Sequence, residues 1–194
     1  MRKSLTVLAL ALATQVSAQT PTPLLPRAPR QHFAALDQPM FANLRTDVHP
    51  MRCCGSTLTK EQEARLTSML EFAEMMFKSG QPVTARQYLR EVVQRQKDGN
   101  AYPGAALRRL ANVEYALGNQ LAAVNALEEL MASAARYGDV DARVGALVDA
   151  TLLYDELGRS DRHAELVRQL QPLLSSPEVP VATNRQVAMM LRLK

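Results

Sequence analysis

One short segment gathers the residue types most able to do chemistry: His49, Met51, Cys53 and Cys54, within the run His-Pro-Met-Arg-Cys-Cys. Imidazole, thioether and thiolate groups are ligands for soft ions such as Cu(I). Cysteines in an oxidising compartment more commonly form disulfides. Neighbouring Cα atoms lie about 3.8 Å apart, below the usual disulfide range of about 4.4 Å upward, so a Cys53–Cys54 ring would be strained. The segment leaves three alternatives open: a metal site, a reactive thiol pair, or a disulfide-linked homodimer.

The rest of the sequence offers little for catalysis. The three histidines are scattered at positions 32, 49 and 163. The carboxylate pairs Glu128-Glu129 and Asp155-Glu156 are sequence neighbours on expected helices, so their members point to different sides. No phosphate-binding Gly-x-x-x-x-Gly-Lys or Gly-x-Gly-x-x-Gly motif occurs. We therefore expect a protein that is not an enzyme, with no catalytic residue and no cofactor.

Residues 1–18 have the pattern of a secretory signal peptide. Arg2 and Lys3 precede an apolar run from Leu5 to Ala13, and Val16-Ser17-Ala18 is a small-residue cleavage site. The apolar run is shorter than the roughly 18–20 residues that a membrane-spanning helix needs. We predict cleavage before Gln19 and export to a periplasm or to the outside, with no transmembrane segment in the mature chain.

Residues 19–57 form a proline-rich region that holds six of the eleven prolines. Proline at this density prevents a continuous helix and favours extended chain. We predict an arm or linker, which either packs on the domain that follows or binds a partner. Residues 58–194, by contrast, carry 17 basic and 17 acidic side chains and are formally neutral, so binding to nucleic acid is not expected.

Residues 58–194 read as a single helical domain. Thr59 and Gln62 form a capping box at the start of the first helix. Apolar residues at helical spacing, interrupted by Gly and Pro, predict further helices, and no stretch alternates with a period of two. The expected helices cover approximately residues 60–79, 82–98, 103–117, 119–136, 140–157, 160–174 and 181 to the end, the sixth capped by Ser160.

Three glycines mark an internal repeat. Gly80, Gly118 and Gly158 are 38 and 40 residues apart. Small residues stand seven positions before each glycine, and apolar residues stand nine and twelve positions after it. Such a pattern is typical of paired helices that approach closely and pack on the next pair. Glycine supplies the positive φ that a tight turn between helices requires.

The sequence resembles the tetratricopeptide repeat (TPR) family. The resemblance covers about residues 58–194 and rests on these pieces: Met76, Ser79-Gly80, Ala85 and Leu89; Leu117-Gly118, Ala123 and Leu127; and Tyr154 with Leu157-Gly158. The period exceeds the usual 34 or so, Met69 stands where the family has Trp or Leu, and no proline closes the first two repeats. The resemblance implies an all-α solenoid of three TPR-like hairpins plus a C-terminal capping helix.

The family's pattern also implies a peptide-binding groove on the first helix of each pair. Carried over to this sequence, its residues are Glu74, Phe77, Lys78, Arg108, Asn112, Tyr115, Leu152 and Asp155. The same positions would also suit ordinary solvated helix faces. We expect an exported scaffold or adaptor of the cell envelope that binds a protein or peptide. The alternatives are a metal- or thiol-redox-active envelope protein that uses residues 49–54, and a structural subunit whose arm inserts into a neighbouring copy.

Overall fold

The computed structural model describes residues 55–191, and this part of the chain is all-helical, with seven α-helices and no β-strand. The helices are α1 (Lys60–Lys78), α2 (Pro82–Asp98), α3 (Gly104–Ala116), α4 (Gln120–Tyr137), α5 (Val140–Glu156), α6 (Ser160–Leu174) and α7 (Val181–Met190). The predicted all-α class is confirmed for these residues. The predictions for the leader, for nearly all of the arm and for His49 to Cys54 lie outside them.

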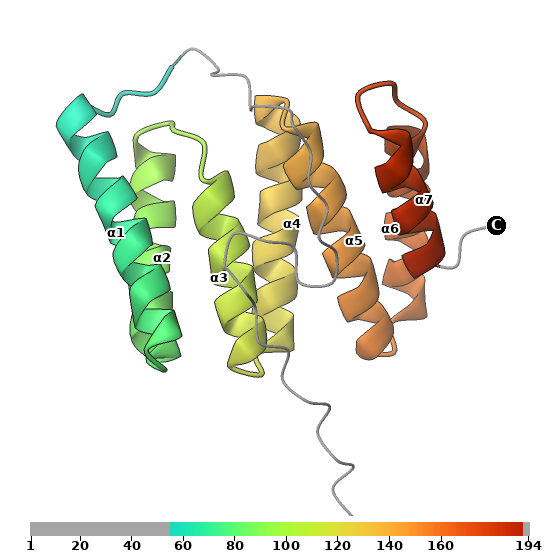
Figure 1. Cartoon of the computed structure of the whole chain (residues 1–194), viewed down its shortest axis with the longest axis horizontal. Helices are drawn as coiled ribbons and strands as arrows, with labels where there is room; N and C mark the ends of the chain where they lie inside the picture. The colour runs from blue at the N-terminus through green and yellow to red at the C-terminus, as the bar shows by residue number, and fades with distance from the viewer. Residues whose placement is uncertain (1–54, 192–194) are drawn as a thin grey trace, which may run out of the picture. The chain divides into compact units, whose positions relative to one another are not determined.

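The helices stand side by side in chain order (Figure 1), and each helix from α1 to α5 packs against the next one. Helices α1, α3 and α5 lie in one layer, which we call the first-helix layer, and α1 also contacts α3. Helices α2, α4 and α6 lie behind it in a second-helix layer (Figure 1). Short turns therefore alternate the chain between two layers, as stacked helical hairpins do.

The three hairpin turns repeat one geometry. Gly80, Gly118 and Gly158 all have positive φ, of 79°, 80° and 67°. After each glycine, the next backbone N–H donates to a carbonyl five residues earlier, at 2.9, 2.8 and 2.9 Å. This is the hydrogen bond of a Schellman motif, which satisfies the free carbonyls at a helix end. The three glycines that the spacing singles out thus share one turn geometry.

The start of α1 is fixed by the predicted capping box. The Thr59 hydroxyl accepts from the Gln62 N–H at 3.2 Å, and the Gln62 side chain accepts from the Thr59 N–H at 2.8 Å. The start of α6 differs from the prediction, because its N-cap is Arg159 rather than Ser160. The Arg159 carbonyl already accepts the first helical hydrogen bond, from His163, so Ser160 lies inside the helix.

The buried core lies between the two layers and is lined by the small residues of the repeat. Ala73, Ala111 and Thr151, seven residues before the three glycines, are each fully buried. Ala85 and Ala123 are fully buried as well, whereas His163, at the corresponding place in the third hairpin, is only half-buried. The predicted close contact between paired helices through a buried small side chain is therefore present in the first two hairpins, and the third has a half-buried histidine at that position. After α6, α7 buries Val187 in the same core.

Candidate functional site

The predicted groove residues all lie on the first-helix layer. Glu74, Phe77 and Lys78 are on α1, Arg108, Asn112 and Tyr115 on α3, and Leu152 and Asp155 on α5. Their exposure differs widely. Lys78 and Asp155 are exposed, and Glu74, Phe77, Tyr115 and Leu152 are half-buried.

Arg108 and Asn112 differ from the prediction, because both side chains are buried rather than exposed on a groove wall. Arg108 is only 6% exposed. Its guanidinium donates to Asp149 Oδ2 on α5 at 2.7 Å and to the Ala142 carbonyl at 3.2 Å. A buried cation needs a paired anion and further hydrogen bonds, and Asp149 supplies the pair. Arg108 therefore links α3 to α5 and is not a free cation for a ligand.

Tyr115 makes a second link between the same two helices. Its hydroxyl donates to both carboxylate oxygens of Glu156 at 3.2 Å, and Gln120 donates to the same carboxylate at 3.3 Å. Partial burial, together with the negative charge of Glu156, raises the pKa of Tyr115 to about 12. Tyr115 is thus neutral near pH 7, with its ring half-exposed on the first-helix layer.

Glu74 links α1 to α3. Its carboxylate lies 2.7 Å from Lys78 Nζ on its own helix and 3.4 Å from Arg109 Nη2 on α3. Together with Arg108–Asp149 and Tyr115–Glu156, this contact gives the first-helix layer polar links between each helix and the next. The layer is therefore mixed in charge, and it also carries the half-buried apolar side chains of Phe77 and Leu152.

The second-helix layer has links of the same kind. Lys97 on α2 lies 2.8 Å from Glu129 on α4, and Arg162 on α6 lies 2.6 Å from Glu128. Glu128 also accepts from the Tyr154 hydroxyl at 2.8 Å. Glu128 and Glu129 thus point to different neighbours, as their adjacency in the sequence predicts.

One buried carboxylate joins the two layers, and sequence reasoning did not identify it. Glu114 on α3 is 1% exposed. It accepts from Arg90 on α2 at 2.6 Å and from the Asn119 side chain at 2.8 Å, with Arg86 at 3.7 Å. The available signal was its position, because Glu114 stands four residues after Leu110 and seven after Leu107 and so lies on the apolar stripe of α3. That position does not reveal the partners.

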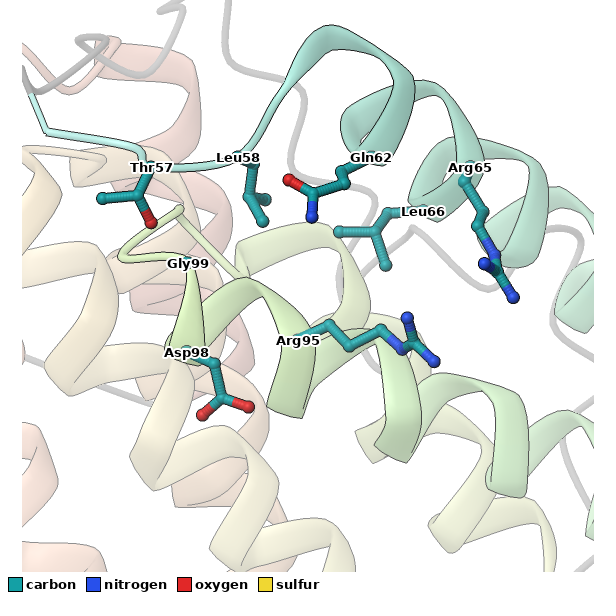
Figure 2. Close-up of a pocket in the computed structure, with 8 residues that line it drawn as sticks. All are labelled: Thr57, Leu58, Gln62, Arg65, Leu66, Arg95, Asp98 and Gly99. Carbon is teal, nitrogen blue, oxygen red and sulfur yellow. The ribbon is translucent and has the colours of Figure 1, made fainter.

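A cavity of about 380 Å³ lies at the start of the helical domain, between the first turns of α1 and the end of α2 (Figure 2). Sequence reasoning did not identify it either, because its walls come from segments some 30 residues apart. It is lined by Thr57, Leu58, Gln62, Arg65, Leu66, Arg95, Asp98 and Gly99. Its volume is within the range of small-molecule sites, about 300–1,000 Å³.

The metal or thiol alternative at His49, Met51, Cys53 and Cys54 lies outside the described residues. Within residues 55–191, no three or more His, Cys, Asp or Glu side chains are grouped as a metal ion would require. None of the helices in that range is both long and apolar enough to cross a bilayer. Comparison with protein-family models, with curated proteins and with solved structures found no match to this chain.

Proposed function

We propose that this protein is an exported, TPR-like protein-interaction module, which acts as a scaffold or adaptor in the cell envelope. The observation that carries the proposal is the first-helix layer, in which three successive hairpins each present a half-exposed apolar side chain. These side chains are Phe77 on α1, Tyr115 on α3 and Leu152 on α5. Aromatic side chains with a polar rim are typical of the energetically important residues of protein interfaces.

The polar links between helices support the same proposal. Because Arg108 and Tyr115 tie α3 to α5, and Glu74 ties α1 to α3, the apolar side chains are held at fixed spacing. A preorganised surface loses less entropy on binding than one that must first be ordered. The exposed Lys78 and Asp155 supply charges of both signs at its edge.

The test is site-specific photocrosslinking in envelope preparations that contain the full mature chain. A photoreactive phenylalanine analogue replaces Phe77 or Leu152, and the control places it at Leu121 on α4. Leu121 is 66% exposed and lies in the second-helix layer, so it is at least as accessible as the test sites. We expect the same partner to be captured from positions 77 and 152 and not from 121. Equal capture from all three, or capture from 121 alone, would refute a binding surface on the first-helix layer.

The proposed export has a separate test. Amino-terminal sequencing of the protein purified from its host is expected to begin at Gln19. A mature chain that retains residues 1–18 would contradict export by signal-peptide cleavage.

A further inference from the structure

The cavity at the start of the domain has walls that are held in place by backbone contacts. The Thr57 N–H donates to the Gly99 carbonyl at 2.8 Å, which fastens the entering chain to the end of α2. Leu58 lies directly on Gly99, because a Cβ at residue 99 would come within 2.3 Å of Leu58 Cδ2. A side chain at position 99 would therefore displace Leu58. The glycine keeps one apolar wall of the cavity in position.

The capping box orients a hydrogen-bond donor toward this cavity. Because the Thr59 N–H donates to Oε1 of Gln62, the amide oxygen is fixed on the side of the helix start. The amide nitrogen points away from that side, toward the space between Leu58 and Leu66 (Figure 2). Among the described residues, no partner is recorded for this nitrogen, so its two N–H groups are available to an acceptor.

Two guanidinium groups extend into the other part of the cavity, across Leu66 from the Gln62 amide. Arg65 on α1 and Arg95 on α2 both reach toward the gap below Leu66 (Figure 2). Arg65 has no ion pair with any described residue. Arg95 is paired with Glu91 one turn away at 2.6 Å, but the two side chains are 46% and 45% exposed. Exposed pairs of this kind are weak, so Arg95 can exchange its partner for a ligand at little cost.

Charge and polarity restrict the ligand further. The guanidinium groups of Arg65 and Arg95 call for an acceptor that carries negative charge. Asp98, which lines the cavity from α2 as Arg95 does, disfavours a group with two negative charges such as phosphate. Leu58 and Leu66 supply apolar surface that a bare anion would leave uncovered. A single carboxylate attached to a small aliphatic group has one negative charge, no second charge near Asp98, and an apolar part that covers the leucines.

We infer that this cavity binds a carboxylate that carries a small aliphatic group, with Arg65 and Arg95 on the carboxylate and the two leucines on the aliphatic part. Two sources share this chemistry: the C-terminal residue of a peptide and a free short-chain carboxylic acid. The site is separate from the first-helix layer, so it does not depend on the proposed function.

The test is an NMR titration of the full mature chain with three probes. N-acetyl-leucine represents a peptide C-terminus, 4-methylpentanoate represents a free acid, and N-acetyl-leucinamide lacks the carboxylate. We expect at least one of the two carboxylates to shift the methyl signals of Leu58 and Leu66 and the Nε–H signals of Arg65 and Arg95. The tighter of the two identifies the source. Shifts of equal size with the amide, or no shift with either carboxylate, would overturn the inference.

Variants separate the cavity from general surface charge. Arg65→Gln is expected to weaken binding about tenfold, the effect of losing one charge-assisted hydrogen bond at an exposed site. Arg185→Gln is the matched control, since Arg185 is an exposed arginine on α7 that forms no ion pair within residues 55–191. It should bind as the parent chain does. If both variants bind equally, the cavity does not hold the carboxylate. Arg65 is exposed, so its replacement should leave the fold and any crosslinking from Phe77 unchanged.

Discussion

The ion pair between Arg90 and Glu114 should contribute several times more to stability than a surface pair of the same length. The two side chains are 2.6 Å apart, and 2% of the side-chain surface of Glu114 is exposed, compared with 58% of that of Arg90. The pair Arg95–Glu91, which also involves an arginine of α2, has the same 2.6 Å separation but lies at the surface on both sides. Arg90–Glu114 joins α2 to α3 and has one buried partner, whereas Arg95–Glu91 lies within α2 and is exposed on both sides, so the second pair is the exposed reference for the first.

The expected magnitude follows from the surroundings of each pair. Unit charges about 4 Å apart attract by about 1 kcal/mol in bulk water and about 4 kcal/mol at an effective dielectric constant of 20. With one partner buried and the other mostly solvated, Arg90–Glu114 lies in the lower part of this range, and we expect a coupling of about 1–2 kcal/mol. Arg95–Glu91 should give about 0.3–0.5 kcal/mol, as exposed pairs one helical turn apart do.

Two double-mutant cycles measure these couplings. Arg90→Gln, Glu114→Gln and their combination form one cycle, and Arg95→Gln, Glu91→Gln and their combination form the other. The free energy of unfolding of each chain comes from urea denaturation followed by circular dichroism. The cycle cancels effects that Glu114→Gln has on Arg86 and Asn119. Equal couplings in the two cycles would refute the reasoning that burial of Glu114 sets the strength of the pair.

Three further predictions concern packing, ionisation and a turn. Ala123→Leu should lower stability by about 1–3 kcal/mol because the site is fully buried. The control Ala164→Leu, at an exposed site on α6, should leave the melting temperature nearly unchanged. Equal melting temperatures of the two variants would contradict a tight helix contact at Ala123. Tyr115 should ionise near pH 12. The difference between the tyrosine absorbance titrations of the parent chain and of Tyr115→Phe should therefore have its midpoint near pH 12 and not near 10. Since the unfolded chain loses this proton first, the contribution of Tyr115 to stability should be intact below pH 10 or so and fall as the pH rises toward 12. Gly158→Ala should cost about 1 kcal/mol from backbone strain alone, because φ is 67° and nothing lies within 4 Å of the added Cβ; no change in the urea midpoint would refute it.

The helices were predictable because their ends are local features. The capping box at Thr59 and the glycines at 80, 118 and 158 act on backbone groups a few residues away, and the sequence displays those residues together. The N-cap of α6 was wrong by one residue because the turn geometry, and not the serine side chain, sets where the helix begins.

The side-chain partners were not predictable because they join residues far apart in the sequence. Glu114 meets Arg90 from 24 residues away, and the cavity depends on Leu58 meeting Gly99. Helical periodicity identifies which face of a helix is apolar, but it does not specify which charge on one helix meets which charge on another. The burial of Arg108 follows from such a partner, Asp149, and not from anything in its own segment.

For Arg108 and Tyr115, a prediction from local spacing can be compared with contacts between distant residues. They are seven residues apart, which is about two helical turns, so the sequence predicts that they share a face of α3. In the structure both face α5, and their partners Asp149 and Glu156 are also seven residues apart, each 41 residues further along the chain. Two equal offsets mean that α3 and α5 run parallel and in register. The glycine interval of 40 residues, however, would place Arg108 opposite Val148, a fully buried apolar residue. The same interval would place Tyr115 opposite Asp155, a carboxylate, yet Tyr115 bonds Glu156. The one-residue shift therefore belongs to the way α3 packs on α5 and does not come from the length of the guanidinium.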